Sequence, residues 1–292
     1  MYRTKKPYFL LFVLPTLVAF AIAFFIPFVL GLVLSFTEFT TVSNATFVGL
    51  RNYVAVFSSG SRFWQAFWFT AKFTVVSTIT VNVLAFFLAL LLTRGRRGTN
   101  FFRTVFFMPN LIGGIVLGYV WKMVLNYGVL IPLFGKDLSF SSTFGFIGLL
   151  AVLCWQQIGY MMIIYIAGLQ AVPDSLIEAA KIDGATGWQT LRQVIFPMVM
   201  PSVTICLFLS ITNSFKLYDQ NLALTGGLPA VTGEGGVTHK MTQMLALCIS
   251  DTYGNSARAH GTAQAMAVIF FLIVAAISLV QLSLTRRKEV QQ

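Results

Sequence analysis

Long runs without a charged residue decide what this chain can fold into. A helix that crosses a bilayer needs about 20 mostly apolar residues, and the uncharged stretch 8–36 exceeds that length. Pro15 and Pro27 lie inside this stretch and are expected to kink it. The pattern predicts an all-α polytopic membrane protein, one transmembrane domain over 1–292. The six predicted spans cover about 9–36, 70–93, 104–125, 144–169, 195–215 and 261–285.

The composition excludes a water-soluble domain. Only 10% of the 292 residues are charged and 57% are hydrophobic, with a mean hydropathy of +0.80, whereas soluble domains carry about 25% charged residues. The net charge of +11 would favour nucleic acid as the partner of a soluble protein. Here the basic residues lie between apolar runs, so membrane topology accounts for them better.

The basic start of the chain has two interpretations. Arg3, Lys5 and Lys6 precede an apolar stretch, as they do in a secretory signal peptide. The apolar core of a signal peptide is about 7–15 residues long and ends at a cleavage site of small residues. Because the uncharged stretch here is much longer, we expect a retained signal anchor that forms the first span.

Lysine and arginine are unequally divided between the two sides of the predicted bundle. With alternating spans, twelve of them lie on the side of both termini and five lie on the other. Cytoplasmic loops carry the excess of these residues, so both termini and the connection between the fourth and fifth spans are predicted to be cytoplasmic. The twelve are Arg3, Lys5, Lys6, Arg94, Arg96, Arg97, Arg103, Lys181, Arg192, Arg286, Arg287 and Lys288, and the five are Arg51, Arg62, Lys136, Lys240 and Arg258.

Catalytic and metal chemistry leave no pattern in the sequence. The three cysteines have no CxxC spacing and the two histidines, His239 and His260, lie far apart, so we expect neither a disulfide framework nor a metal site. No acid/base pair or nucleophile triad is evident, and we expect no enzyme. The chain has no GxxxxGK[ST] phosphate loop. If ATP drives its activity, another polypeptide must bind the nucleotide.

The connection at 172–197 is predicted to form two short helices joined at a glycine. Pro173 and Asp174 are suited to starting the first helix, with Asp174 as the candidate N-cap. Gly184 tolerates a positive φ and permits the bend. The second helix is expected to begin near Thr186 and to be interrupted at Pro197.

Small side chains in the first of these helices allow a close approach to another protein. Ala179 and Ala180 let the backbone enter a groove, and Glu178 places a carboxylate at its rim. From the residues alone, an ordinary amphipathic helix at the membrane surface explains the segment equally well.

A family resemblance favours docking to another protein over a helix at the membrane surface. The string EAAKIDGA at 178–185, followed by Trp188, Pro197 and Pro201, resembles the EAA loop of permease subunits in binding-protein-dependent ABC importers. Phenylalanine stands before Pro197 where the family pattern usually has leucine. The resemblance implies a coupling helix that docks in a cleft of the ATPase, formed by Glu178, Ala179, Ala180, Asp183, Gly184 and Ala185.

Three further segments are similar to the carbohydrate-importing branch of that family. They are FVGLRNY at 47–53, FFRTVFFMP at 101–109 and LTGGLP at 224–229, where Leu228 replaces a third glycine. Together with the EAA loop they cover nearly the whole chain. The resemblance implies a multiple-sugar, raffinose or maltose type of system in a bacterial cell membrane.

The same resemblance implies the partners. A homologous second permease would complete a heterodimer, two copies of an ATPase would bind ATP and Mg²⁺, and an extracytoplasmic solute-binding protein would deliver a sugar, with an oligosaccharide expected. This chain itself would hold no cofactor and would bind no nucleic acid. The alternative that we retain is a secondary transporter or channel without an ATPase, which usually shows internal repeats or charges buried in mid-span.

Polar side chains inside the spans are candidates for the path of the transported sugar. Such residues are costly in a membrane and tend to face a cavity or another helix. Hydrogen bonds between helices are the competing explanation. The packing explanation is favoured for Asn82 and Asn110. For the candidates in the fourth span, packing and the sugar path are equally supported. For the candidates in the fifth span, the sugar path is favoured. The path candidates are Gln156 and Tyr160 in the fourth span and Ser210, Asn213 and Ser214 in the fifth.

Overall fold

The computed structural model divides the chain into two compact units, which are described separately. One unit comprises residues 1–61 and 249–271, and the other comprises residues 62–248 and 272–292. The prediction of one transmembrane domain over the whole chain stays a prediction. The structure describes residues 6–58, 61–93, 98–232 and 238–286.

The first unit contains the predicted first span and a small capping structure beside it. The span is helical from Lys6 to Leu34, and the cap is a two-stranded antiparallel hairpin followed by a short helix. Asn52 of that helix donates hydrogen bonds to the carbonyls of Ser35 and Thr37, at 3.0 and 2.9 Å, and so fastens the cap to the end of the span. The elements are α1 (Lys6–Phe20), a π turn (Ala21–Phe25), α2 (Ile26–Leu34), β1 (Thr37–Glu38), β2 (Thr46–Phe47) and α3 (Arg51–Phe57).

The second unit is a helical bundle with a short hairpin, β3 (Ala230–Thr232) paired antiparallel with β4 (Thr238–Lys240). Helices α14 (Leu245–Asn255) and α15 (His260–Arg286) each contribute residues to both units. The remaining helices are α4 (Arg62–Leu92), α5 (Thr99–Phe107), α6 (Gly114–Leu125), α7 (Ile131–Phe134), α8 (Ser142–Gln170), α9 (Asp174–Ile182), α10 (Gly187–Thr190), α11 (Phe196–Met198), α12 (Met200–Phe215) and α13 (Asp219–Leu224).

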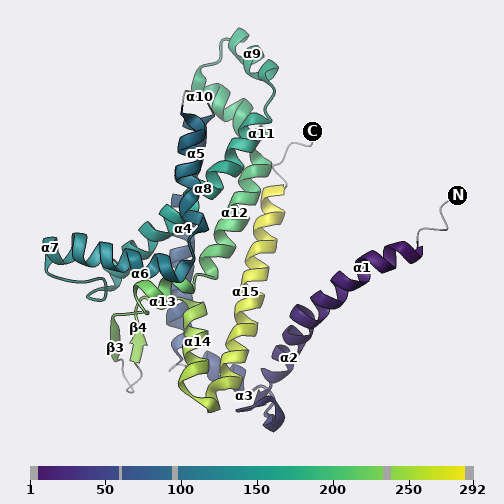
Figure 1. Ribbon diagram of the computed structural model, residues 1–292, viewed down its shortest axis with the longest axis vertical. Helices are drawn as coiled ribbons and strands as arrows, with labels where there is room; N and C mark the ends of the chain where they lie inside the picture. Colours follow the sequence, from purple (N-terminus) through teal and green to yellow (C-terminus); the bar gives the residue numbers. More distant parts are fainter. Residues whose placement is uncertain (1–5, 59–60, 94–97, 233–237, 287–292) are drawn as a thin grey trace. The chain divides into compact units, whose positions relative to one another are not determined.

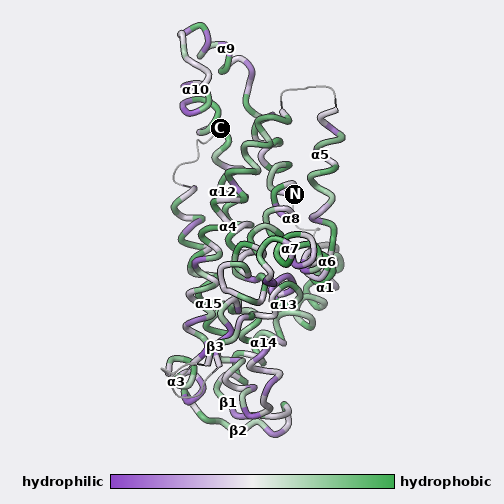
Figure 2. The backbone as a smooth tube through the Cα atoms, turned by 90° about the vertical axis from the view of Figure 1, so that its left-hand side faces the viewer, coloured by the Kyte–Doolittle hydropathy of each residue, from purple (hydrophilic) through white to green (hydrophobic). Residues whose placement is uncertain are grey.

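The core of the second unit lies between α4, α8 and α12, which run side by side (Figure 1). Two clusters of buried side chains fill it, one toward each end of α8. Glycine permits the closest backbone approach, since a Cβ on Gly159 would lie 1.8 Å from the carbonyl oxygen of Phe106 in α5. Figure 2 shows hydrophobic residues along the three helices and hydrophilic stretches in α9 and α10, at one end of the bundle.

Three π turns interrupt the long helices, and each ends two residues before a proline. They span Ala21–Phe25, Asn126–Leu130 and Leu191–Ile195, ahead of Pro27, Pro132 and Pro197. In each, the residue next to the proline donates its N–H to the carbonyl five residues back. Proline has no N–H and its ring clashes with the carbonyl four residues back. The wider turn relieves this clash and keeps the helix continuous.

The third predicted span differs from an unbroken helix over 104–125. Helix α5 ends at Phe107, a 3-10 turn follows over Met108–Leu111, and α6 starts at Gly114 and continues through a π turn into α7. Pro109 lies in the turn and Gly113 adopts an extended conformation, with φ −60° and ψ 138°. The mostly apolar run predicted one helix, but proline and glycine break its backbone.

The fifth predicted span is bent rather than straight. The helical segment Gly187–Met198 meets α12 at an angle of 70°. The break falls at Val199, between Pro197 and Pro201, where two missing backbone donors weaken the helix. The bend turns the preceding loop away from the axis of α12.

Candidate functional site

The loop between α8 and α12 begins with a short helix whose first turn differs from the prediction. Pro173 precedes α9 in an extended conformation and Asp174 is already inside the helix, so Asp174 is not the side-chain N-cap that we expected. A carboxylate in the first turn still interacts favourably with the helix dipole. Ala180 is buried on the inner side of α9, and Ile177 is half-buried there.

Gly184 ends α9 in the conformation that the sequence predicts. Its φ is +78°, and a Cβ at this position would meet nothing within 4 Å. The N–H of Gly184 donates to the carbonyl of Lys181 at 3.1 Å and that of Ala185 to the carbonyl of Ala180 at 2.9 Å. These bonds satisfy carbonyls that the helix end would leave free. Substitution is therefore limited by backbone conformation rather than by space.

The second helix of the loop starts at Thr186, as predicted. The Gln189 side chain accepts a 2.7 Å hydrogen bond from the N–H of Thr186, and the Thr186 hydroxyl accepts one from the N–H of Gln189. This reciprocal capping box holds α10 at a set angle to α9. The two caps, at Gly184 and Thr186, make the loop a stiff hairpin of helices.

Two of the large apolar side chains of the loop are far more exposed than the others. Ile182 is 86% exposed and Trp188 is 68% exposed. Apolar side chains of this size, exposed together on a polar loop, are typical of a protein contact. Ile182 was not among our candidates, although its place next to Asp183 and Gly184 in the motif could have signalled it.

The six predicted coupling residues divide between the outer and inner surfaces. Glu178, Ala179, Asp183 and Gly184 are exposed, whereas Ala180 is buried and Ala185 is half-buried. A groove lies beneath the loop, and Ile177 of α9 packs there against the buried cluster that includes Ala89 of α4 and Leu169 of α8. The lining residues of the groove are Leu90, Thr93, Leu169, Val172, Ile177, Gly187, Leu191 and Ile195.

Two path candidates in α12 lie in hydrogen bonds between helices. Ser210 accepts a 2.9 Å hydrogen bond from Asn82 of α4, whose carbonyl oxygen accepts one from the Tyr165 hydroxyl of α8 at 2.7 Å. The hydroxyls of Ser214 and Ser77 are 2.9 Å apart. All five side chains are buried. The cluster connects α4, α8 and α12, and it matches the packing role expected for Asn82.

Gln156 lies at the break between α5 and α6. Its Nε2 donates to the carbonyl of Ile112 at 3.0 Å, and its Oε1 accepts from Gln220 of α13 at 2.6 Å. The first bond satisfies a backbone carbonyl that the broken helix leaves without a helical partner. Gln156 therefore connects the break and α13 to α8.

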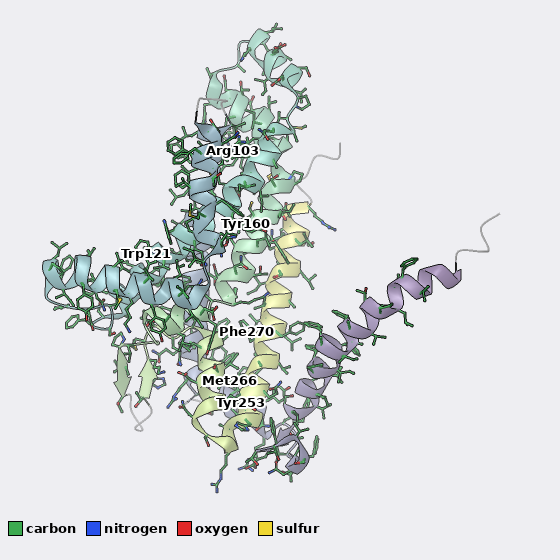
Figure 3. The ribbon with its side chains drawn as sticks, viewed as in Figure 1. Arg103, Trp121, Tyr160, Tyr253, Met266 and Phe270 are labelled. Carbon is green, nitrogen blue, oxygen red and sulfur yellow. The ribbon has the colours of Figure 1, made fainter. Side chains whose placement is uncertain are left out.

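Asn213 and Tyr160 are the path candidates that stay half-buried. Asn213 donates a 3.3 Å hydrogen bond to Gln157 of α8, and both, together with Ser210 and Ser214, line a gap between α4, α8 and α12 whose solvent-accessible volume is about 0 Å³. That volume is too small for a sugar ring with its hydrogen-bonding groups. Tyr160 packs at the edge of the core, farther from α9 than Arg103 lies (Figure 3). The structure does not bring the five candidates into one pocket.

Among the described residues, no three histidine, cysteine, aspartate or glutamate side chains cluster as metal ligands. The described helices include five that are long and apolar enough to cross a membrane, and six when the bent pair at Val199 counts as one span. A bundle of this kind with a stiff helical loop at one end defines a multi-pass helical membrane protein.

The family follows from comparison with known proteins. Residues 81–290 match the family described as binding-protein-dependent transport system inner membrane component. The match covers well over half of the chain, which therefore belongs to this family and is a permease subunit of a transport system. The predicted family membership is confirmed.

Two relatives match nearly the full length of the chain. The probable starch degradation products transport system permease protein of Thermoanaerobacterium thermosulfurigenes is 43% identical, over 96% of this chain and 94% of that protein. The multiple sugar-binding transport system permease protein of Streptococcus mutans is 31% identical, over 96% of this chain and 95% of that protein.

A solved structure confirms the fold. The crystal structure of a bacterial ABC transporter involved in the import of the acidic polysaccharide alginate contains a chain that aligns with a TM-score of 0.78. The alignment covers 98% of both chains at 18% identity. At that identity the likeness shows that the fold of an ABC permease is shared.

Proposed function

We propose that this chain is a permease subunit that carries a carbohydrate, with an oligosaccharide as the expected cargo. The observation that carries the proposal is the 43% identity, over 96% of the chain, to a permease named for starch degradation products. The second relative is named for multiple sugars. Membership of a binding-protein-dependent family disfavours the alternative of a channel or secondary transporter.

The loop from α9 to α10 supports the proposal that a separate ATPase drives transport. It is capped at Gly184 and Thr186, it exposes Ile182 and Trp188, and its Ile177 packs against the core cluster of α4 and α8. In the proposed mechanism the ATPase closes on ATP and Mg²⁺, pushes α9, and tilts these helices. The cavity between two homologous permeases then opens alternately to each side of the membrane.

The proposed assembly contains two permeases, two ATPase copies and an extracytoplasmic solute-binding protein in a bacterial cell membrane. Both termini lie in the cytoplasm with the α9 loop, as the distribution of lysine and arginine predicts. ATP hydrolysis belongs to the ATPase, because this sequence has no phosphate loop.

The half-buried polar residues are the better candidates for contact with the cargo. We assign that role to Asn213, Gln157 and Tyr160, whose side chains keep access to the outside of the bundle in this chain. Ser210, Ser214 and Gln156 connect helices through hydrogen bonds. Ser210 and Ser214 also line the small gap beside Asn213, but their side chains are buried, so they hold the helices around it.

The test is uptake by the complete importer in proteoliposomes with binding protein and ATP. We expect uptake of labelled starch oligosaccharides, and mass spectrometry should find such a sugar on the binding protein purified from cells. Asn213→Leu should raise the half-saturating sugar concentration roughly tenfold, as expected for the loss of about one to two hydrogen bonds, while basal ATP hydrolysis stays unchanged.

Asn82→Leu is the matched control, because it removes the same amide from a site inside the bundle. It should reduce the amount of assembled protein rather than the sugar affinity. Uptake of amino acids or ions in place of carbohydrate would refute the proposed cargo. An Asn213→Leu variant that fails to assemble would place Asn213 with the packing residues.

A further inference from the structure

An open pocket of about 360 Å³ lies between α4 and α8, at the end of the second unit away from α9. Its walls combine a cation, aromatic rings and hydroxyl groups. None of these side chains has a role in the transport mechanism proposed above. The side chains that matter are Gln65, Trp68 and Lys72 from α4 and Ser142, Thr143 and Phe146 from α8.

Lys72 lies at the boundary of the membrane's hydrocarbon layer. From Phe73 to Leu92, α4 carries no charge, and these residues span about 30 Å at about 1.5 Å each, which is the thickness of that layer. Trp68 and Trp64, one and two turns before Lys72, are both exposed. Tryptophan concentrates at the interface between hydrocarbon and headgroups, so the pocket lies at headgroup depth.

The charge of Lys72 has no acidic partner among the residues that the structure describes. Its Nζ lies 5.6 Å from the ring centroid of Phe146, a cation–π contact that leaves the other side of the ammonium open. Thr143 and Ser142 lie in the first turn of α8, where the helix dipole is positive. The pocket therefore attracts an anion.

An exposed apolar stripe continues from the pocket along the same face of α4. Val75, Ile79 and Val83 follow Lys72 at spacings of three and four residues, and their side chains are 59%, 59% and 61% exposed. On α8, Ile147 follows Thr143 by four residues and is also exposed. This stripe offers no polar group that could hydrogen-bond to a carbohydrate in place of water. An acyl chain needs no such group and fits the stripe.

We propose that this pocket binds an anionic phospholipid. The ammonium of Lys72 pairs with the lipid phosphate, and the hydroxyls of Ser142 and Thr143 donate hydrogen bonds to it. Trp68 covers the glycerol, and an acyl chain lies on Val75 and Ile79. The site depends on the membrane-spanning fold and not on which cargo the permease carries.

The test is native mass spectrometry of the purified importer with added phosphatidylglycerol or phosphatidylcholine. Wild type should retain phosphatidylglycerol in preference to phosphatidylcholine. Lys72→Gln should lower that retention roughly fivefold, as expected for one basic residue near a lipid headgroup, and Lys72→Arg should keep it. Lys122→Gln, a matched loss of charge in α6, should leave retention unchanged.

Other outcomes would overturn the proposal. Equal retention by wild type and Lys72→Gln, or equal retention of both lipids, would show that the pocket selects no anionic headgroup. Displacement of the lipid by millimolar inorganic phosphate would indicate a site for free phosphate. A Lys72→Gln variant with normal lipid retention but weaker sugar uptake would assign the pocket to the cargo.

Discussion

Gly184 shows how one residue controls a surface that a partner would use. Its φ of +78° lets Ala185 bond back to Ala180, which closes α9 and directs the chain into α10. A residue with a Cβ in this left-handed conformation costs about 1–2 kcal/mol. Nothing lies within 4 Å of the place a Cβ would take, so the penalty comes from the backbone alone.

Gly184→Ala should therefore weaken coupling without preventing insertion. A cost of about 1–2 kcal/mol lowers the ratio of closed to open hairpin roughly 5- to 30-fold, and ATP-driven uptake in proteoliposomes should fall by up to that factor. Gly187→Ala is the matched control, since Gly187 also has open space but no positive φ. If the two variants transport equally well, the conformation of Gly184 is not what coupling requires.

The long helices contain three π turns, all placed ahead of prolines. In the turn over Leu191–Ile195, the N–H of Phe196 bonds to the carbonyl of Leu191, so Pro197 can sit in the helix without a clash. A π turn holds one residue more than the α-helical turn it replaces. If the π turn becomes an α-helical turn, the segment before it rotates by about 100° relative to the rest of the helix.

Pro197→Ala should convert this turn to regular α-helix and reorient the α9 loop. Distances between spin labels at Ile182 and at an exposed site on α8 should change from wild type, and uptake should fall several-fold while the protein still inserts. Pro201→Ala, in the first turn of α12 and outside any π turn, is the control. Unchanged label distances in Pro197→Ala would mean that the turn does not set the loop's direction.

The whole molecule combines an apolar bundle with a polar, stiff loop at one end and no phosphate loop of its own. In the proposed mechanism the loop holds the ATPase in place. Ile182 and Trp188 are the exposed apolar side chains available for that contact. Burial of a side chain such as isoleucine contributes about 1.5–3 kcal/mol.

Ile182→Asp should lower recovery of the ATPase with the purified permeases roughly tenfold or more, because it loses that burial and adds a charge to the interface. Quantitative mass spectrometry of the affinity-purified complex measures the ratio of subunits. Val231→Asp, an equally drastic change at an exposed position in β3, should leave the ratio at wild type. Equal ratios in both variants would exclude Ile182 from the docking surface.

The sequence by itself determined the class of fold, the approximate positions of the spans, and the bend at Gly184 with the helix start at Thr186, although the expected cap at Asp174 was wrong. Span lengths follow from the thickness of the bilayer, and Gly184 and Thr186 act through bonds to residues a few positions away. These are local or solvent-imposed constraints, so they can be recognised without the rest of the chain. The same reasoning predicted the family through the EAA string and its surroundings.

Tertiary structure decided what each polar side chain does. Ser210, Asn213 and Ser214 share a helical spacing, yet two of them bond to α4 and one remains half-buried beside Gln157. Gln156 serves a helix break 44 residues away, and Lys72 meets Phe146 only because α4 packs on α8. Such partners come from distant parts of the chain, and no local pattern specifies which helix will lie opposite.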